Sequence, residues 1–326
     1  MPTFTPAPWQ PLPAPKLTED LQENEILTSA DLWPVDTSGP EDVVIDAHGV
    51  AYTGTADGSI LAVTASGVDR VIAEVGGRPL GIEWYGDDLL VCNADLGLQL
   101  VSMTGSLSTL ADGFEGVPFL FTNNAAVASD GTVYFTDTST RWSIHDYTDD
   151  LLEGQTTGRL FSRAPTGELS VLADGFQFAN GVALDPSESS VFVAETGRYR
   201  VHRHWLRGDD AGSTELFLDN LAGFPDNLTF GNDTLWVSMA SPRQGIVDLI
   251  APRTWMRSMS YRLPNAVKPK PVRHGIVLGF DVDGHLVNNL QDSTGRVAIT
   301  TSARFHDGRL FIGSLMDPHI AVHDLG

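Results

Sequence analysis

The chain has 326 residues, of which 20 are Lys or Arg and 42 are Asp or Glu, so its formal net charge is −22. A chain this acidic repels the phosphates of nucleic acids and of anionic membranes, and we expect neither as a partner. Hydrophobic residues make up 42% of the chain and charged residues 19%. This composition is typical of a folded protein rather than a disordered one.

The first 20 residues are rich in proline, from Pro2 to Pro15. This pattern predicts an extended arm over residues 1–20, ahead of a single domain over residues 21–326. The arm lacks the basic start and apolar core of a secretory signal, and no stretch of the chain approaches the ~18 apolar residues of a membrane span. Cys92 is the only cysteine, which excludes an intrachain disulfide. We therefore expect a cytoplasmic protein.

A hairpin pattern recurs along the chain after the arm. Each copy has an apolar run, a turn such as Asp-Gly, and a second run rich in β-branched and aromatic residues. The copies span residues 43–52, 81–91, 126–137, 182–195, 228–237 and 303–312. Further strand-like pairs lie between them, so each unit holds four strands. Six such units predict an all-β fold, a six-bladed β-propeller with four-stranded antiparallel blades.

Two insertions interrupt the repeat, at residues 140–153 and 241–271. The second has apolar residues near helical spacing, which predicts a partly helical insertion near residues 243–270. It is also basic, in contrast to the acidic remainder of the chain. Two interpretations stay open for these segments: a solvated connector, or a lid over a pocket.

Four of the repeats place an oxygen-bearing side chain at the start of the innermost strand. Those residues are Glu41, Asn123, Asn180 and Asp226. Because the innermost strands of a propeller converge on its central axis, we expect the four side chains to form one ring. Two carboxylates and two amides make a hard, all-oxygen ligand set, which favours Ca²⁺, although another divalent cation could take its place.

The motifs around this ring resemble a known superfamily. They are residues 77–82, 134–142, 178–184, 193–196, 224–228 and 313–315. They are similar to those of the gluconolactonase, regucalcin and paraoxonase superfamily of six-bladed propellers, most closely the strictosidine-synthase-like branch that includes adipocyte plasma membrane-associated protein. The resemblance covers roughly residues 20–326, and the motifs around Asn180 and Asp226 are its most specific part.

The resemblance implies that Glu41, Asn123, Asn180 and Asp226 are calcium ligands, with Asn227 as a further contact to metal or substrate. In that superfamily the metal polarises a carbonyl or phosphoryl oxygen of the substrate. Asp226 is then the candidate general base or nucleophile, with plain ligation as the alternative, and Asn123 is a second catalytic candidate. Asn124 stands where many relatives have Asp, which places a second, structural calcium in doubt.

Aromatic residues flank the ring motifs and predict a substrate pocket with apolar walls. The predicted pocket residues are Phe121, Trp142, His145, Phe178 and Phe224. His145 lies in the first insertion, where it could act at the pocket rim as a paraoxonase-like base.

We therefore expect a calcium-dependent hydrolase of lactones or esters that acts on a small-molecule substrate. Two alternatives stay open: a non-catalytic, metal-stabilised propeller that binds a ligand, and metal-assisted C–C or C–N bond chemistry. Pictet–Spengler condensation is disfavoured, because true strictosidine synthases use a glutamate on the last blade and residues 295–302 contain no carboxylate. No Gly-x-Ser-x-Gly motif or Gly-rich phosphate loop is present, which argues against serine hydrolases and nucleotide enzymes.

Overall fold

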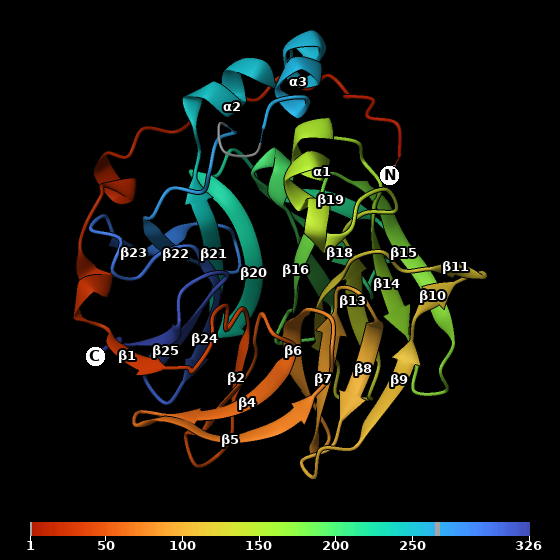
Figure 1. Cartoon of the computed structure of the whole chain (residues 1–326), viewed down its shortest axis with the longest axis vertical. Coiled ribbons are helices and arrows are strands. Elements are labelled where there is room, and N and C mark those ends of the chain that lie inside the picture. Colours follow the sequence, from red (N-terminus) through yellow and green to blue (C-terminus); the bar gives the residue numbers. More distant parts are fainter. Residues whose placement is uncertain (1, 265–267) are drawn as a thin grey trace.

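Six four-stranded antiparallel sheets surround a common axis in the computed structural model, which describes residues 2–264 and 268–326 (Figure 1). The predicted six-bladed β-propeller is thus confirmed. Blade I holds β2 (Val43–Ile45), β3 (Ala51–Gly54), β4 (Ser59–Thr64) and β5 (Gly67–Glu74). Blade II holds β6 (Pro79–Tyr85), β7 (Asp88–Asn93), β8 (Gly97–Val101) and β9 (Leu107–Ala111), and a small hairpin follows it, β10 (Gly113–Phe114) and β11 (Val117–Pro118).

The next three blades repeat the same order along the chain. Blade III holds β12 (Thr122–Val127), β13 (Val133–Asp137), β14 (Gly158–Arg163) and β15 (Leu169–Phe176). Blade IV holds β16 (Ala179–Leu184), β17 (Ser190–Glu195), β18 (Arg200–Trp205) and β19 (Thr214–Leu218). Blade V holds β20 (Gly223–Gly231), β21 (Thr234–Pro242), β22 (Gly275–Phe280) and β23 (Leu286–Asp292).

Blade VI joins the two ends of the chain. It holds β24 (Thr300–His306), β25 (Arg309–Ser314) and β26 (His319–Asp324), and its outermost strand is β1 (Asp31–Pro34). Strand β1 pairs antiparallel with β26, with Trp33 opposite Ile320. This pairing completes the last blade with a strand that precedes the first blade in the sequence, and so closes the ring of blades.

Six buried apolar clusters lie between neighbouring blades and hold the ring of sheets together. Between blades III and IV, for example, Leu160 and Phe176 pack against Val182, Val191 and Val193. Equivalent clusters join every other pair of neighbours, including blade VI to blade I. Because both faces of each sheet are covered, the strands read as continuous apolar runs, which is why the repeat is visible in the sequence.

Within the described residues, α-helices interrupt two blades, and both interruptions link the second strand of the blade to the third. In blade III the link holds η3 (Ile144–Asp146) and α1 (Tyr147–Glu153), and in blade V it holds α2 (Gly245–Ile250) and α3 (Thr254–Tyr261). The predicted helical insertion is present, although residues 265–267 of that range lie outside the described residues. All three α-helices gather at one end of the propeller (Figure 1).

The remaining short helices are η1 (Glu19–Leu21), η2 (Ile26–Ser29) and η4 (Thr196–Arg198). Residues 2–18 form no helix or strand and cross the helical end of the propeller. There Phe4 stacks on Tyr261 of α3, with ring centroids 4.1 Å apart, and the N–H of Ala7 donates to the carbonyl of Glu153 in α1. Within the described residues, no helix is long and apolar enough to cross a membrane.

Candidate functional site

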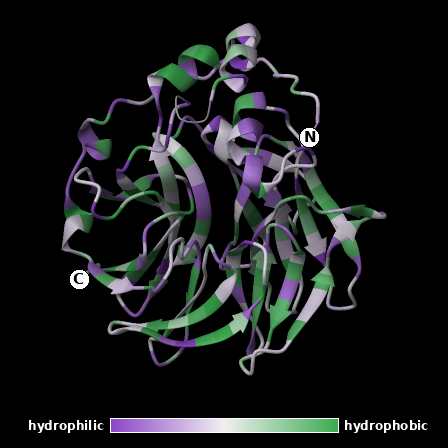
Figure 2. Ribbon diagram, in the orientation of Figure 1, coloured by the Kyte–Doolittle hydropathy of each residue, from purple (hydrophilic) through white to green (hydrophobic). Residues whose placement is uncertain are grey.

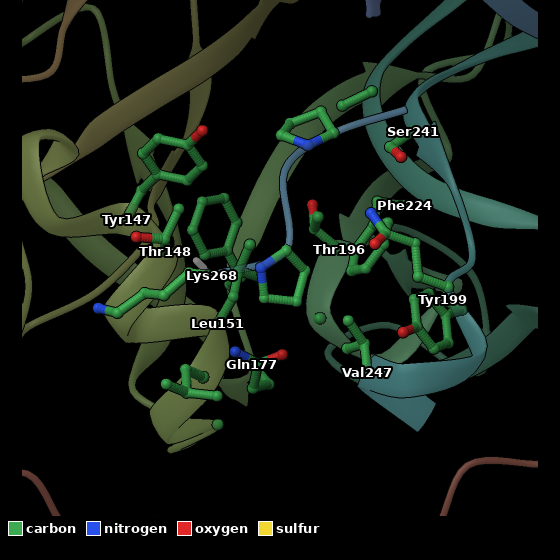
Figure 3. Close-up of a pocket in the computed structure, with 18 of the residues that line it drawn as sticks. Tyr147, Thr148, Leu151, Gln177, Thr196, Tyr199, Phe224, Ser241, Val247 and Lys268 are labelled. Carbon is green, nitrogen blue, oxygen red and sulfur yellow. The ribbon is translucent and has the colours of Figure 1, made fainter. Parts of the chain in front are cut away.

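A cavity of about 450 Å³ lies between the propeller and the helices that cover this end. Most of its walls are apolar, with Leu151 and Tyr147 contributed by α1 and Val247 and Ile250 by α2. Figure 3 shows Tyr147 and Leu151 on one side of the pocket and Phe224, Tyr199 and Val247 on the other. Both insertions therefore line the pocket, which favours the lid interpretation over the solvated connector.

The predicted ring residues all line this cavity. Glu41 directly precedes blade I, and Asn123, Asn180 and Asp226 lie on β12, β16 and β20. On those three strands, the pairing with the next strand shifts register at the ring residue and the residue after it. A β-bulge of this kind bends the strand and re-aims its side chains. The other two blades present Leu80 and Ile299 to the cavity, so four of the six blades supply oxygen atoms.

Three ring side chains carry a buried oxygen that has no hydrogen-bond partner within the described residues. These atoms are Glu41 Oε2, Asn123 Oδ1 and Asn180 Oδ1. Buried polar atoms are nearly always satisfied, and three unsatisfied acceptors from three blades at one cavity floor need a common explanation. A cation would satisfy all three, and the donor set is the hard, oxygen-only set that Ca²⁺ prefers. The residues present therefore fit a divalent cation.

Two threonines orient the ring amides. Asn123 Nδ2 donates to Thr138 Oγ1 at 2.9 Å, and Asn180 Nδ2 donates to Thr196 Oγ1 at 3.1 Å. Each hydroxyl in turn donates to a carbonyl of the next blade, Thr138 to Ala179 and Thr196 to Pro225. Because each amide nitrogen is held in this way, the amide oxygen is left free to bind a cation.

Replacing either threonine by Val is expected to weaken Ca²⁺ affinity about tenfold or more, because the amide can then rotate its nitrogen toward the site. Isothermal titration calorimetry on Thr138→Val and Thr196→Val measures this change. The matched control is Thr229→Val, which removes a similar inter-blade bond, from Thr229 Oγ1 to the carbonyl of Ala303, that involves no ring amide. Equal affinities in all three variants would refute the orienting role.

The residues that follow the ring form a second layer below it. Asn124 Nδ2 donates to Asp42 Oδ2 at 3.1 Å, and Asn124 Oδ1 accepts from the N–H of Val182 at 2.9 Å. Asn124 thus ties three blades together through protein hydrogen bonds, and these bonds give no support to a second calcium beside it. Asn227 differs, because its Nδ2 donates to Glu41 Oε1 at 3.1 Å while its buried Oδ1 has no partner among the described residues.

Burial raises the pKa of both ring carboxyls. Loss of solvent raises the pKa of Asp226 to about 8, and the negative charge of nearby Asp42 adds to the effect. Burial, with the charges of Asp226 and Asp42, also raises the pKa of Glu41 well above its ordinary value. A cation at the ring would oppose this destabilisation of the charged forms.

The predicted pocket residues divide into two groups. Phe121, Phe178 and Phe224 line the cavity as expected. Trp142 and His145 are not among the described residues that line it, so their placement in the pocket is corrected. Trp142 is buried beside Phe4 and Tyr261, with Nε1 donating to Glu153 Oε2 at 2.7 Å. The side chain of His145 is 69% exposed, and its Nε2 lies 2.8 Å from Asp95 Oδ1.

Several cavity residues were not predicted. The arm contributes Trp9, which contacts Tyr199 with ring centroids 5.7 Å apart, and blade VI contributes Ile299. Phe178 and Ile299 have φ angles of +65° and +52°, a strained conformation for bulky residues that the surrounding structure maintains at the cavity. No signal in the sequence marks a positive φ at Phe or Ile, and the contacts of Trp9 depend on how the arm crosses the lid.

Asp150 of α1 provides a pH-dependent feature beside the cavity. Burial raises its pKa to about 7 against the hydrogen bond that Ser139 Oγ donates to it at 2.6 Å. Because the folded protein binds this proton more tightly than the unfolded chain, the free energy of unfolding falls as pH rises from about 4 to about 7. Asp150→Asn is therefore expected to raise the melting temperature at pH 8 by about 2–5 °C and to leave it unchanged near pH 4. Thermal melts of both proteins across this range test the assignment, which fails if the difference between them does not change with pH.

Comparison with known proteins places the chain in a family. Residues 123–209 match the strictosidine synthase family, and residues 20–63 match the strictosidine synthase-like N-terminal family. Adipocyte plasma membrane-associated protein of Salmo salar is 33% identical over 316 residues, which are 88% of this chain and 76% of that protein. The chain belongs to the strictosidine synthase-like family. Strictosidine synthase-like protein 10 of Arabidopsis thaliana, another member, is 31% identical over 92% of this chain and 91% of its own.

Solved structures share the fold of this family member. A gluconolactonase from Xanthomonas campestris aligns with a TM-score of 0.67 and 18% identity over 91% of this chain and 90% of its own. A calcium-binding regucalcin from Agrobacterium tumefaciens aligns with a TM-score of 0.61 and 14% identity, over 90% of this chain and 95% of its own. At these identities the likeness establishes the propeller fold alone.

Proposed function

We propose that this protein is a calcium-dependent hydrolase of lactones or esters. The observation that carries the proposal is the set of unpartnered oxygens of Glu41, Asn123 and Asn180 on the floor of an apolar cavity. The cation site and the substrate space thus coincide. The two structural neighbours, a gluconolactonase and a calcium-binding regucalcin, are consistent with this assignment.

Glu41, Asn123, Asn180 and Asp226 would hold the cation. When bound, Ca²⁺ would polarise the substrate carbonyl and stabilise negative charge on its oxygen. Asp226 would accept the proton of the attacking water, because Glu41 and Asp226 are the only carboxylates among the described residues that line the cavity, and no histidine lines it. Phe121, Phe178 and Phe224 would bind the apolar part of the substrate and exclude bulk water.

One observation favours a second candidate, a non-catalytic propeller that binds an apolar ligand. Both carboxylates of the cavity are also candidate metal ligands, so no separate base is present among the described lining residues. This alternative predicts calcium binding and ligand binding without turnover.

A paired assay separates the two candidates. The purified protein is screened against lactones and aryl esters with calcium, and again after treatment with EDTA, while its calcium content is measured. Hydrolysis that EDTA abolishes and calcium restores supports the hydrolase. Bound calcium without turnover of any compound would instead support the ligand-binding alternative, and hydrolysis that is insensitive to EDTA would contradict both.

A further inference from the structure

The charge of the protein is distributed unevenly. Its basic part is residues 243–273, which lie largely within the second insertion and which we call the lid from here on. Seven of the 20 basic residues lie in this segment, but Asp248 is the only one of the 42 acidic residues there. The segment carries α2 and α3 and therefore covers the cavity end of the propeller. The lid is thus a positive segment of an otherwise negative chain.

Some of these basic side chains serve the fold. Arg243 pairs with Asp248, Lys268 pairs with Asp149, and Arg273 pairs with Asp317. Arg257 is buried and donates to the backbone carbonyls of Ala7, Leu152 and Ala251. The remaining three, Arg253, Arg262 and Lys270, are exposed and form no ion pair within the described residues.

The lid also exposes an unusual number of large apolar side chains. We call this set the lid patch: Ile246, Leu249, Trp255, Met259, Leu263 and Val272. Trp255 and Met259 are the most exposed residues of the patch, at 63% and 61%. Figure 2 shows hydrophobic stretches on the helices at this outer end. Scattered exposed apolar residues are ordinary, but six within one basic segment mark an interaction surface.

The two lid helices have two different apolar faces. On α3, Trp255 and Met259 are one turn apart and exposed, whereas Met256 and Ser260 line the cavity. On α2, Leu249 is exposed, whereas Val247 and Ile250 line the cavity. Ile246 and Leu263 of the patch also line the cavity, but Leu249, Trp255, Met259 and Val272 do not, so closure of the cavity does not account for the exposure of these four.

We propose that the lid patch docks the protein on an anionic lipid surface. Exposed Trp and aliphatic side chains flanked by Arg and Lys, with no exposed acidic residue in the segment, are the composition of an interfacial membrane-binding helix pair. A protein partner would require a surface of complementary shape. A lipid surface requires only apolar side chains that can enter the interface and basic side chains that attract its anionic headgroups. Since α2 and α3 also wall the cavity, docking would bring the cavity next to lipid-dissolved molecules.

This inference reverses the expectation, based on net charge alone, that an anionic membrane repels the protein. Charges screen each other over a Debye length of about 8 Å at physiological salt. An acidic body that lies farther from the surface than this contributes little repulsion, while the lid charges act at contact. The arrangement of charge therefore decides the interaction, not the sum.

Vesicle co-sedimentation of the full chain tests the proposal. The probes are phosphatidylcholine vesicles with and without about 30% phosphatidylglycerol, at about 50 mM and about 500 mM salt. We expect binding to the anionic vesicles to exceed binding to the neutral ones by about tenfold at low salt, and to weaken at high salt. Trp255→Ser/Met259→Ser and Arg253→Glu/Arg262→Glu are each expected to lower anionic-vesicle binding about tenfold.

Matched controls use residues outside the lid. Val71→Ser/Val117→Ser removes two apolar side chains of 54% and 59% exposure, and Arg70→Glu/Arg207→Glu reverses two exposed charges. These controls should bind as the wild type does, and thermal melts verify that every variant is folded. The proposal is overturned if anionic vesicles bind no better than neutral ones, or if lid and control variants bind equally. A dimer that only the lid substitutions dissociate would also overturn it, because the patch would then belong to a second copy of the chain.

Discussion

Replacing Asp226 by Asn is expected to lower kcat/KM for lactone or ester hydrolysis by about a thousandfold or more. The substitution keeps the shape of the side chain but removes one of the two carboxylates on the cavity floor. Asp226 is buried on β20, where its charge would both attract the cation and accept a proton from water. The loss therefore combines weaker calcium binding with the loss of the base.

Calcium titration separates these two roles, and Glu41→Gln provides the matched variant. If Asp226 acts as the base, saturating calcium leaves kcat low in Asp226→Asn but restores it in Glu41→Gln, since Glu41 is a ligand only. If saturating calcium restores both variants equally, Asp226 is a ligand without a proton-transfer role. Wild-type turnover in Asp226→Asn at low calcium would contradict both roles.

The second large effect is expected in stability rather than activity. Glu153→Ala should lower the free energy of unfolding by about 3–5 kcal/mol, because it leaves several donors without an acceptor. The buried carboxylate of Glu153 accepts from Trp142 Nε1 at 2.7 Å, from Arg141 Nε at 2.7 Å and Nη2 at 2.8 Å, and from the N–H of Thr5 at 2.6 Å. It joins α1, the rim of the cavity and the N-terminal arm.

Denaturant unfolding measures this loss, with Glu188→Ala as the control. Glu188 forms a more exposed pair with Arg207 at 3.9 Å and accepts exposed hydrogen bonds from the N–H and Oγ of Ser129 at 2.7 and 2.9 Å, so its removal should change stability by about 1 kcal/mol. Burial opposes ionisation of Glu153, but its hydrogen bonds from Arg141, Thr5 and Trp142 outweigh burial and lower its pKa. The contribution of ionised Glu153 to the free energy of unfolding is therefore present above the ordinary glutamate pKa and is lost as pH falls through the lowered pKa. The stabilities of the Glu153→Ala and Glu188→Ala variants should therefore approach each other in acid. Equal stability losses at neutral pH would show that Glu153 does not hold the arm and α1 together.

The sequence predicted the blades and the cavity-lining ring residues well for a common physical reason. Each blade buries both faces of its strands, so apolar runs recur along the chain. The ring residues occupy equivalent positions in four of these repeats. Asn123, Asn180 and Asp226 each lie at the bulge of an inner strand, and the equivalence of their positions in the repeat is visible without a structure. Their roles as ligands and catalytic residues stay predictions.

Features that depend on distant contacts could not be predicted in this way. Strand β1 has no hairpin partner in the sequence, because its partner β26 lies at the other end of the chain. The first insertion placed Trp142 and His145 near the pocket, but sequence position does not give side-chain direction, and Glu153 and Asp95 hold these residues away from the cavity wall. The basic character of the second insertion is visible in the sequence, but the exposure of its apolar side chains at the outer end of the propeller is not.

Calcium content, measured by elemental analysis after dialysis against micromolar calcium, tests the central claim most directly. The ring of Glu41, Asn123, Asn180 and Asp226 predicts tightly bound calcium in the wild-type chain and its loss from the Glu41→Gln/Asp226→Asn double variant, with Thr229→Val as the unaffected control. A wild-type chain that retains no calcium, or a double variant that retains as much as the wild type, would contradict the account.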